Sequence, residues 1–382
     1  MNYNFNGLKC ISNAKLLLLL VVGAFMVSNC TSEEGPMTGV DPDPEVLLSE
    51  LRQEIAIQLA DHHILPSYDK LSIASQDLLT AVQNVNSAVN VESLNSLKMG
   101  LQRTWLVWQQ ASIYQMGPTE TNALRGALNT YPSDKVKIEL NISNGSWVIG
   151  ALDNKAAVGF PAIDYLVNSE SETEVVNALT EDPARLAYLT ELIHALDTKI
   201  QKVVSEWETG SFITNYKSTT ANGTDVGSAL GMLVNSIDLH FQRFLRDGKV
   251  AIPAGVRSAG VSRPLAIEAL YGGYSRELLK ESIQAYSNLI QGFGVDGNNG
   301  KSIAAYLVAL DQKQIGDDML ASLSTSLSII ESMDADLGIQ IDLDNDKMIE
   351  TFMELQTFVT LVKSDMSSVM GITITNQDTD GD

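Results

Sequence analysis

The sequence predicts an all-α protein made of two tandem domains, each resembling a four-helix bundle. Apolar residues recur every three or four positions through most of the 382-residue chain, and this is the period of an amphipathic helix. Glycine, proline and asparagine fall mainly between these periodic segments, where they are expected to form turns. A chain of this length is large enough to bury two separate cores.

The N-terminal residues resemble a bacterial lipoprotein signal peptide. Lys9 and Lys15 precede an apolar run at residues 16–27. This run has the length of a signal-peptide core and is too short for a comfortable transmembrane helix. Small or modest residues precede Cys30, as a lipoprotein signal peptidase requires. We expect residues 1–29 to be a signal peptide, Cys30 to carry a lipid such as palmitate, and residues 30–44 to form a flexible tether. An uncleaved membrane anchor is the alternative.

The first bundle is predicted to cover residues 45–215. Its helices are expected at residues 46–59, 66–89, 91–114, 156–168 and 183–208. In the third of these, Trp105 and Trp108 share one apolar face and are typical of a core. Periodicity fails at residues 116–147, where we expect a long connection with at most short helices. Connections of this length in compact domains are usually functional or covered by a neighbour.

The second bundle is predicted to cover residues 216–370, after a polar boundary near residue 220. Its helices are expected at residues 224–246, 266–292, 301–336 and 345–370. Residues 371–382 are expected to form an acidic tail, which begins with a short β-branched, strand-like run at residues 372–375.

Charge and cysteine content exclude several classes of protein. The formal net charge is −22, so nucleic acid and anionic lipid surfaces are poor partners. A cation, a basic protein surface or simple solubility would each explain the excess of acids. The two cysteines, Cys10 and Cys30, fall in the signal peptide and at the lipid site. The mature chain therefore has no disulfide, cysteine nucleophile or Cys-ligated metal site.

The order of several short motifs resembles that of the imelysin-like proteins, a family filed under the name of an M75 peptidase. These motifs are Ile-Leu-Pro-Ser-Tyr at 64–68, Gly-Pro at 117–118, Asn-Thr-Tyr-Pro at 129–132, Gly-Phe-Pro-Ala-Ile-Asp at 159–164, Ser-Arg-Pro at 262–264, the helix at 278–289, and the closing residues 369–374 with the acidic 378–382. The resemblance implies a helical, exported or lipid-anchored bacterial protein with a role in iron or haem acquisition.

The family signature, Gly-x-His-x-x-Glu, is altered in this sequence. In that signature the His and the Glu lie on one helix face and can converge on a metal. Here Gly159 is present, but Pro161 replaces the His and Asp164 replaces the Glu. Proline has no ligand atom, so the expected His-plus-carboxylate site cannot form and catalysis is disfavoured. The alternative is a plain helix start, with Pro161 in the first turn and Asp164 as a favourable acid.

Other metal ligands are scattered. His62, His63, His194 and His240 are expected to be surface or partly packed residues. The acidic runs at residues 342–346 and 378–382 space carboxylates like part of a calcium loop, but both lack the bidentate glutamate that completes an EF-hand. The first is equally a cap cluster at a helix N-terminus, and the second is equally a disordered acidic tail. Iron, haem and calcium therefore all remain open as ligands, and the sequence names none of them.

A binding site is predicted between the two bundles, where the long connection meets the helix that starts at Gly159, because pockets are common at domain junctions. The predicted lining residues are Arg125, Asn129, Tyr131, Asp164 and Arg263. The alternative for the two arginines is ordinary salt bridging between domains.

The sequence favours a non-catalytic binding or accessory protein. It would be lipid-anchored in the outer membrane of a Gram-negative bacterium, on the periplasmic face or the cell surface. The resemblance to imelysin-like proteins further implies that it works with an outer-membrane uptake system for iron or haem. Two alternatives stay open: a metal-dependent M75-type peptidase, and a structural envelope lipoprotein without a small ligand.

Overall fold

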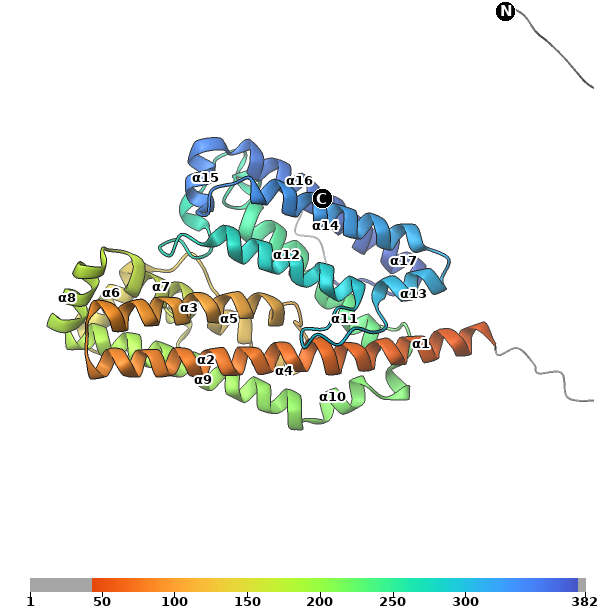
Figure 1. The fold of residues 1–382 in the computed structure, drawn as a ribbon, viewed down its shortest axis with the longest axis horizontal. Coiled ribbons are helices and arrows are strands. Elements are labelled where there is room, and N and C mark those ends of the chain that lie inside the picture. Colours follow the sequence, from red (N-terminus) through yellow and green to blue (C-terminus); the bar gives the residue numbers. More distant parts are fainter. Residues whose placement is uncertain (1–42, 377–382) are drawn as a thin grey trace, which may run out of the picture. The chain divides into compact units, whose positions relative to one another are not determined.

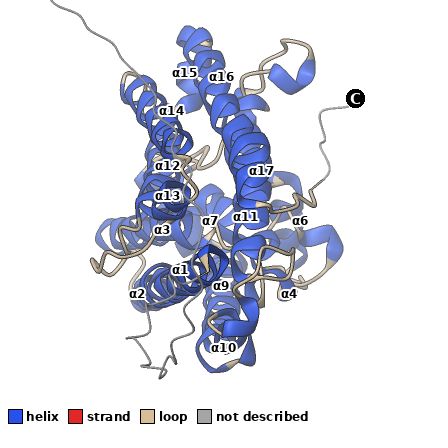
Figure 2. Cartoon of the chain, turned by 90° about the vertical axis from the view of Figure 1, so that its right-hand side faces the viewer, coloured by secondary structure: helices blue, strands red, loops and turns tan. Residues whose placement is uncertain are grey.

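The computed structural model describes residues 43–376, and helices joined by loops make up this part of the chain (Figures 1 and 2). The predicted signal peptide, the lipid site Cys30, nearly all of the tether and the acidic residues 377–382 lie outside the described residues. Asp43–Asp382 form one compact unit, which contains every described core residue and so carries a complete core of its own. The division into bundles at residues 45–215 and 216–370 stays a prediction.

Three long helices build the first half of the unit. α1 (Pro44–Leu59) runs through one turn of π-helix, η1 (Ala60–Ile64), into α2 (Leu65–Ser87). α2 packs between α3 (Val91–Ala111) and α9 (Pro183–Thr209). Polar residues set the starts of these helices, because the side chains of Asp43, Asn90 and Asp182 accept hydrogen bonds from the free N–H groups of the first turn. These helices agree with the predicted ones to within a few residues.

The predicted long connection holds only short helices. They are α4 (Pro118–Thr121), α5 (Leu124–Leu128), α6 (Lys135–Asn144) and the 3₁₀ turn η2 (Leu152–Asn154). α7 (Gly159–Asn168) and α8 (Glu172–Glu181) follow, and then, after α9, α10 (Ser211–Tyr216) and the 3₁₀ turn η3 (Thr219–Ala221). The sequence analysis did not predict α8, although Ser171 and Glu174 form the capping box that starts it.

The second half of the unit begins with α11 (Ala229–Leu239), which continues as a wide π-helix, η4 (His240–Ala251). Two 3₁₀ turns follow, η5 (Val256–Ser258) and η6 (Pro264–Ala266). The remaining helices are α12 (Ser275–Gln291), α13 (Ile303–Ala309), α14 (Lys313–Glu331), α15 (Leu337–Asp344), α16 (Asp346–Thr360), the π-turn η7 (Leu361–Met366) and α17 (Ser367–Met370).

Three predictions for this half need correction. The helix expected at residues 266–292 begins only at Ser275, because Ala269 and Gly273 adopt left-handed backbone conformations that no α-helix accepts. The helix expected at residues 301–336 is two helices, separated at Asp311, which also has a positive φ. The run at residues 372–375 forms no strand. Asn235 takes the place of a partner strand there, since its side-chain amide bonds the backbones of Thr373 and Thr375.

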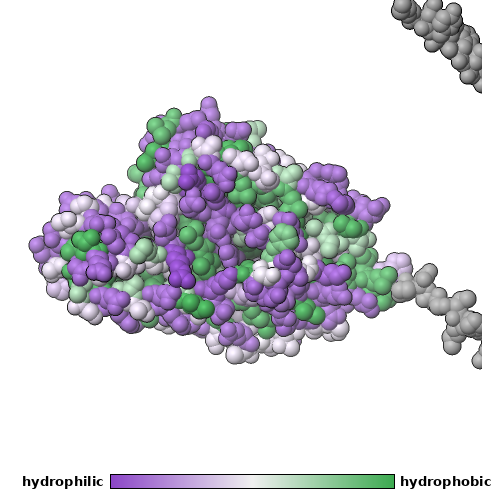
Figure 3. All heavy atoms as spheres, viewed as in Figure 1, coloured by the Kyte–Doolittle hydropathy of each residue, from purple (hydrophilic) through white to green (hydrophobic). Residues whose placement is uncertain are grey.

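The core and the surface divide as the amphipathic pattern predicts. Trp105 and Trp108 in α3 are fully buried, as expected, and α3 packs against both α2 and α12. The face drawn in Figure 3 is mostly hydrophilic, with apolar residues gathered in small patches. Within residues 43–376, none of the helices has both the length and the apolar character needed to span a bilayer.

Candidate functional site

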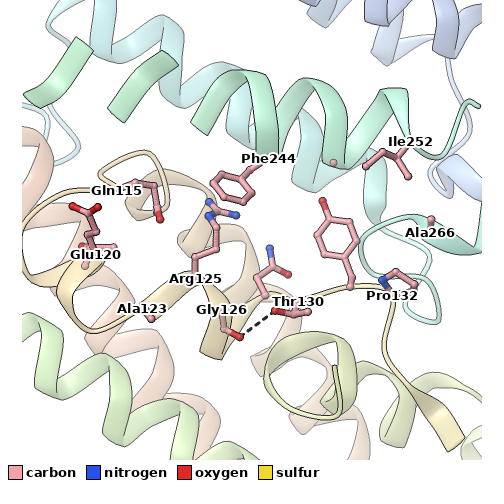
Figure 4. Close-up of a pocket in the computed structure, with 14 residues that line it drawn as sticks. Gln115, Glu120, Ala123, Arg125, Gly126, Thr130, Pro132, Phe244, Ile252 and Ala266 are labelled. Carbon is pink, nitrogen blue, oxygen red and sulfur yellow. Dashed lines mark hydrogen bonds between the residues drawn. The ribbon is translucent and has the colours of Figure 1, made fainter. Parts of the chain in front are cut away.

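A cavity of about 450 Å³ lies between the long connection and η4 (Figure 4). One wall comes from α4, α5 and the turn after them, and the other comes from Phe244 and Gly248 of η4 with Ile252 beyond its end. Its size falls within the range of small-molecule sites, roughly 300–1,000 Å³. The residues that line it are Gln115, Thr119, Glu120, Ala123, Arg125, Gly126, Asn129, Thr130, Tyr131, Pro132, Phe244, Gly248, Ile252 and Ala266.

Arg125 is the cation of this cavity. Its guanidinium lies 4.1 Å from the ring centre of Phe244 and 5.4 Å from that of Trp108, and Nη2 donates a hydrogen bond to the Ser112 carbonyl (3.2 Å). Its Nε atom has no hydrogen-bond partner, and no ion pair in residues 43–376 includes Arg125. Burial lowers the pKa of Arg125 to about 10, so the side chain stays charged at neutral pH. Arg125 is therefore a cation held by aromatic rings without a salt bridge, and the buried Glu268 carboxylate acts on its charge only through a longer-range attraction.

Behind the cavity lies a buried polar cluster centred on Glu268. Its carboxylate accepts hydrogen bonds from Trp105 Nε1 (3.0 Å), Gln109 Nε2 (3.3 Å) and Asn129 Nδ2 (2.6 Å), and it pairs with the ammonium of Lys249. Burial opposes ionisation of Glu268, but Lys249 and the amide donors outweigh it and lower the pKa of the carboxyl. The cluster is thus a charge pair with most of its hydrogen bonds made.

Asn129 connects this cluster to the cavity. The Glu268 carboxylate only accepts hydrogen bonds, so the amide nitrogen of Asn129 must face it. The amide oxygen of Asn129 is then left buried without a partner in the described chain. An unpaired buried acceptor is costly, and a donor from a ligand in the cavity would satisfy it.

Tyr131 packs against η4 at a glycine. A Cβ atom added at Gly248 would lie 3.0 Å from the Tyr131 hydroxyl, so the absence of a side chain there lets the tyrosine approach the helix. Burial raises the pKa of Tyr131 well above its usual value, which keeps the phenol protonated. Tyr131 can therefore donate a hydrogen bond at the cavity wall.

Asp164 and Arg263, which the sequence also placed in the site, are not among the residues that line this cavity. Asp164 is buried in α7 and accepts hydrogen bonds from the backbone N–H of Tyr271 (2.9 Å) and from Asn168 Nδ2 (2.9 Å). Burial raises its pKa to about 6, against these hydrogen bonds. Arg263 is exposed on the loop between η5 and η6. The structure thus brings together Arg125, Asn129 and Tyr131 of the five predicted residues.

Comparison with known proteins assigns the family. The sequence model of the family described as imelysin, peptidase M75, matches residues 64–363. The chain belongs to the imelysin family. Two similar crystal structures, each 17% identical in sequence, are an imelysin-like protein from Psychrobacter arcticum 273-4 and a candidate iron-regulated protein A precursor from Parabacteroides distasonis ATCC 8503.

Both structures match nearly the whole chain. The first has a TM-score of 0.68 and covers 85% of this chain and 97% of its own. The second has a TM-score of 0.66, with 86% and 96% covered. At this identity the likeness shows the all-α imelysin-like fold and no more. No curated protein matches the sequence.

The imelysin-like motif at residues 159–164 has a clear packing role. Gly159 begins α7 with φ +74, and a Cβ atom there would lie 2.3 Å from the carbonyl oxygen of Leu128. Glycine is therefore required where α7 crosses α5. Pro161 lies in the first turn of α7, as the alternative interpretation expected, and is buried there.

Two histidines are more buried than expected, and one acidic run is described by the structure. His63 and His240 are almost fully buried, whereas the histidines were expected to be surface or partly packed residues. His240 hydrogen-bonds with Ser112 Oγ (2.9 Å) and Tyr286 (2.7 Å), which satisfies both ring nitrogens inside the core. Asp342 and Asp344 lie within α15 and Asp346 begins α16, so that run is helical rather than an open loop. Residues 43–376 contain no group of three or more His, Cys, Asp or Glu placed to hold a metal ion.

Sequence reasoning missed Phe244, Lys249 and Glu268. Glu268 lies between Ile267 and Ala269, and a single charge inside an apolar run is a signal for a buried, paired side chain. Lys249 gives no such signal, because Arg246 and Asp247 come just before it. The signal gives no partner, because Glu268 meets α3 and the 129–132 turn from more than a hundred residues away.

Proposed function

We propose that this imelysin-family protein is a non-catalytic binding protein of the bacterial envelope, which takes an organic anion into the cavity around Arg125. The observation that carries the proposal is the Arg125 guanidinium, held on Phe244 and Trp108 without a salt bridge in the described chain. An unpaired cation on an apolar wall favours a ligand that joins an acidic group to an apolar body. The strongly acidic chain makes such a cation uncommon.

The proposed role is iron or haem uptake at the outer membrane. Support comes from the name of one structural neighbour, an iron-regulated protein A precursor. Haem carries two carboxylates on a flat apolar body, and ferric carboxylate chelates are anions, so both classes have the chemistry that Arg125 would recognise. The predicted lipid on Cys30 would hold the protein beside an outer-membrane uptake system.

The test is a titration of the compact unit Asp43–Asp382 with haem, followed by absorbance, and with ferric citrate, followed by calorimetry. We expect saturable binding of one of them, weakened about tenfold or more by Arg125→Gln because a charge-assisted hydrogen bond is lost. Arg263→Gln is the matched control, because it removes an exposed arginine outside the cavity, and it should leave the affinity unchanged.

Two results would overturn the proposal. One is equal affinity of the wild type and Arg125→Gln for both compounds, or no saturable binding of either. The other is cleavage of a protein substrate that a chelator abolishes, since this would restore the alternative of an M75-type metallopeptidase.

The membrane anchor is tested separately in cells. We expect wild-type protein to incorporate radioactive palmitate and to sediment with outer membranes, and Cys30→Ala to lose the label because it lacks the acceptor thiol. A Cys10→Ala chain, altered within the predicted signal peptide, serves as the control. Equal labelling of wild type and Cys30→Ala would contradict the predicted lipid site.

A further inference from the structure

A second cavity, of about 520 Å³, adjoins the first. Ala123, Gly126 and Thr130 line both. Its other walls come from α9 and from the segment that leads into α7, and small or apolar residues dominate them. These residues include Ala127, Ile149, Gly150, Ala151, Val158, Leu192, Ala195 and Leu196. The size and the apolar walls suit the body of a small organic molecule.

Two lysines supply the charge of this second cavity. Lys155 and Lys199 both line it, and neither side chain forms an ion pair or a hydrogen bond with another residue in 43–376. Acidic residues outnumber basic ones 47 to 25 in this chain, so most cations can find a carboxylate. The alternative is that both lysines are ordinary solvated surface residues. However, both line a cavity with apolar walls, and their long side chains can reach into it.

Gly126 belongs to the linings of both cavities and is labelled beside Thr130 in Figure 4. A Cβ atom added at Gly126 would meet no atom within 4 Å, so open space lies directly above its backbone. The hydroxyl of Thr130 donates a hydrogen bond to the Gly126 carbonyl (3.1 Å) and closes the turn after α5. The backbone shared by the two cavities is therefore held by this hydrogen bond, and Gly126 puts no side chain into the space beside it.

We infer that the two cavities form one site for an elongated amphipathic anion with acidic groups at both ends. One acidic group pairs with Arg125 and the other with Lys155 and Lys199, while the apolar body lies across Gly126. This inference rests on the part of the proposed function that places an organic anion at Arg125, and it favours an elongated dianion over haem, whose two carboxylates lie at one edge. Cations in each of two adjoining cavities with mainly apolar walls favour a dianion over a monoanion of the same length.

The probes are matched aliphatic chains titrated into the unit Asp43–Asp382 by calorimetry. They comprise a series of linear dicarboxylates from octanedioate to hexadecanedioate, together with dodecanoate and dodecanediol. We expect one dicarboxylate to bind best and about tenfold more tightly than the monocarboxylate, because a second charge-assisted contact forms. The diol, which has no charge, should bind most weakly.

Three variants locate the contacts. Lys155→Gln combined with Lys199→Gln should lower the affinity for the best dicarboxylate about tenfold and leave that for dodecanoate nearly unchanged. Gly126→Leu should abolish binding of the long dicarboxylates, because its side chain would fill the junction. Lys135→Gln, at an exposed lysine outside both cavities, is the control and should bind like the wild type. Thermal unfolding followed by circular dichroism checks that each variant folds.

The outcomes separate this inference from the proposed function. If the double lysine variant keeps wild-type affinity for every dicarboxylate while Arg125→Gln loses it, the second cavity has no role and only the proposed function survives. If no dicarboxylate binds better than dodecanoate, the two-ended ligand is excluded. If Arg125→Gln also leaves haem and ferric citrate binding unchanged, the proposed function fails as well. Should Gly126→Leu fail to fold, the double lysine variant decides the question.

Discussion

At the scale of single residues, Asp164 makes stability depend on pH. Burial raises its pKa from 3.8 to about 6, so between these values the folded chain binds more protons at this site than the unfolded chain. Stability from Asp164 is therefore present below about pH 4 and lost as pH rises through 6. The full change is about 3 kcal/mol, at 1.36 kcal/mol per pKa unit.

This prediction is checked by urea unfolding of wild type and Asp164→Asn at several pH values. The variant cannot titrate at this position. The free energy of unfolding of the wild type, relative to the variant, should fall by about 2.4 kcal/mol between pH 4 and pH 7, which is most of the full change. A difference that stays constant over this range would show that the carboxyl titrates normally.

The pair of Lys249 and Glu268 gives a second prediction at this scale. Both side chains are almost fully buried, so Lys249→Met would leave the Glu268 carboxylate as an uncompensated charge. We expect a loss of about 3–5 kcal/mol in the free energy of unfolding. Adding Glu268→Gln to that variant should recover much of the loss, because no buried charge then remains. Urea denaturation of both variants measures this, and equal loss in the single and double variants would contradict it.

At the scale of elements, η4 gives the cavity one of its walls. The wide turns of this helix bring Phe244 over Arg125, Gly248 against Tyr131 and Lys249 to Glu268. Turns of π-helix are often found at functional sites, and η4 is π-helical over its whole span, His240–Ala251. The element therefore joins one wall of the cavity to the charge pair behind it.

The crossing of α5 and α7 gives a prediction for the family motif. Gly159→Ala would place a methyl group 2.3 Å from the Leu128 carbonyl oxygen and hold alanine at a φ of +74. We expect a loss of about 2–4 kcal/mol in stability from overpacking and strain together. Gly126→Ala, where a Cβ atom meets nothing within 4 Å, is the matched control and should change stability little. Thermal and urea unfolding compare the two, and a Gly159→Ala protein as stable as the wild type would contradict the packing role.

Helical periodicity was enough to predict the long helices, because each is fixed by its own apolar face, and α1, α3 and α9 also by a capping residue. It could not predict the turn at residues 267–274, whose left-handed residues Ala269 and Gly273 let the Tyr271 N–H reach Asp164 in a distant helix. The residues of the candidate site likewise fall into those that the sequence could predict and those that it could not. Arg125 stood out as a scarce cation in the long connection, whereas the partners of Glu268 depend on contacts between distant segments, which no local pattern contains.

At the scale of the whole molecule, contacts cross the predicted boundary between the two bundles. Trp105 in α3 donates to Glu268 (3.0 Å), Arg52 in α1 donates to Tyr306 in α13 (2.8 Å), and the backbone N–H of Gln115 donates to Ser236 in α11 (2.6 Å). Much of this contact is buried, and Glu268 in particular would be left without its donors if the halves separated. We therefore expect residues 43–382 to unfold as one cooperative unit rather than as two independent bundles.

The positions of the tryptophans allow the predicted cooperative unfolding to be tested without added labels. All four belong to the first predicted bundle, at Trp105, Trp108, Trp147 and Trp207. Tryptophan fluorescence therefore reports on the first half and on the contact of Trp105 with Glu268, whereas far-ultraviolet circular dichroism reports on helices of both halves. Urea transitions followed by the two signals should coincide, with equal midpoints and equal slopes. If fluorescence changes at a different urea concentration from part of the helical signal, the bundles unfold separately, and the interface through Glu268 contributes less to stability than its burial implies.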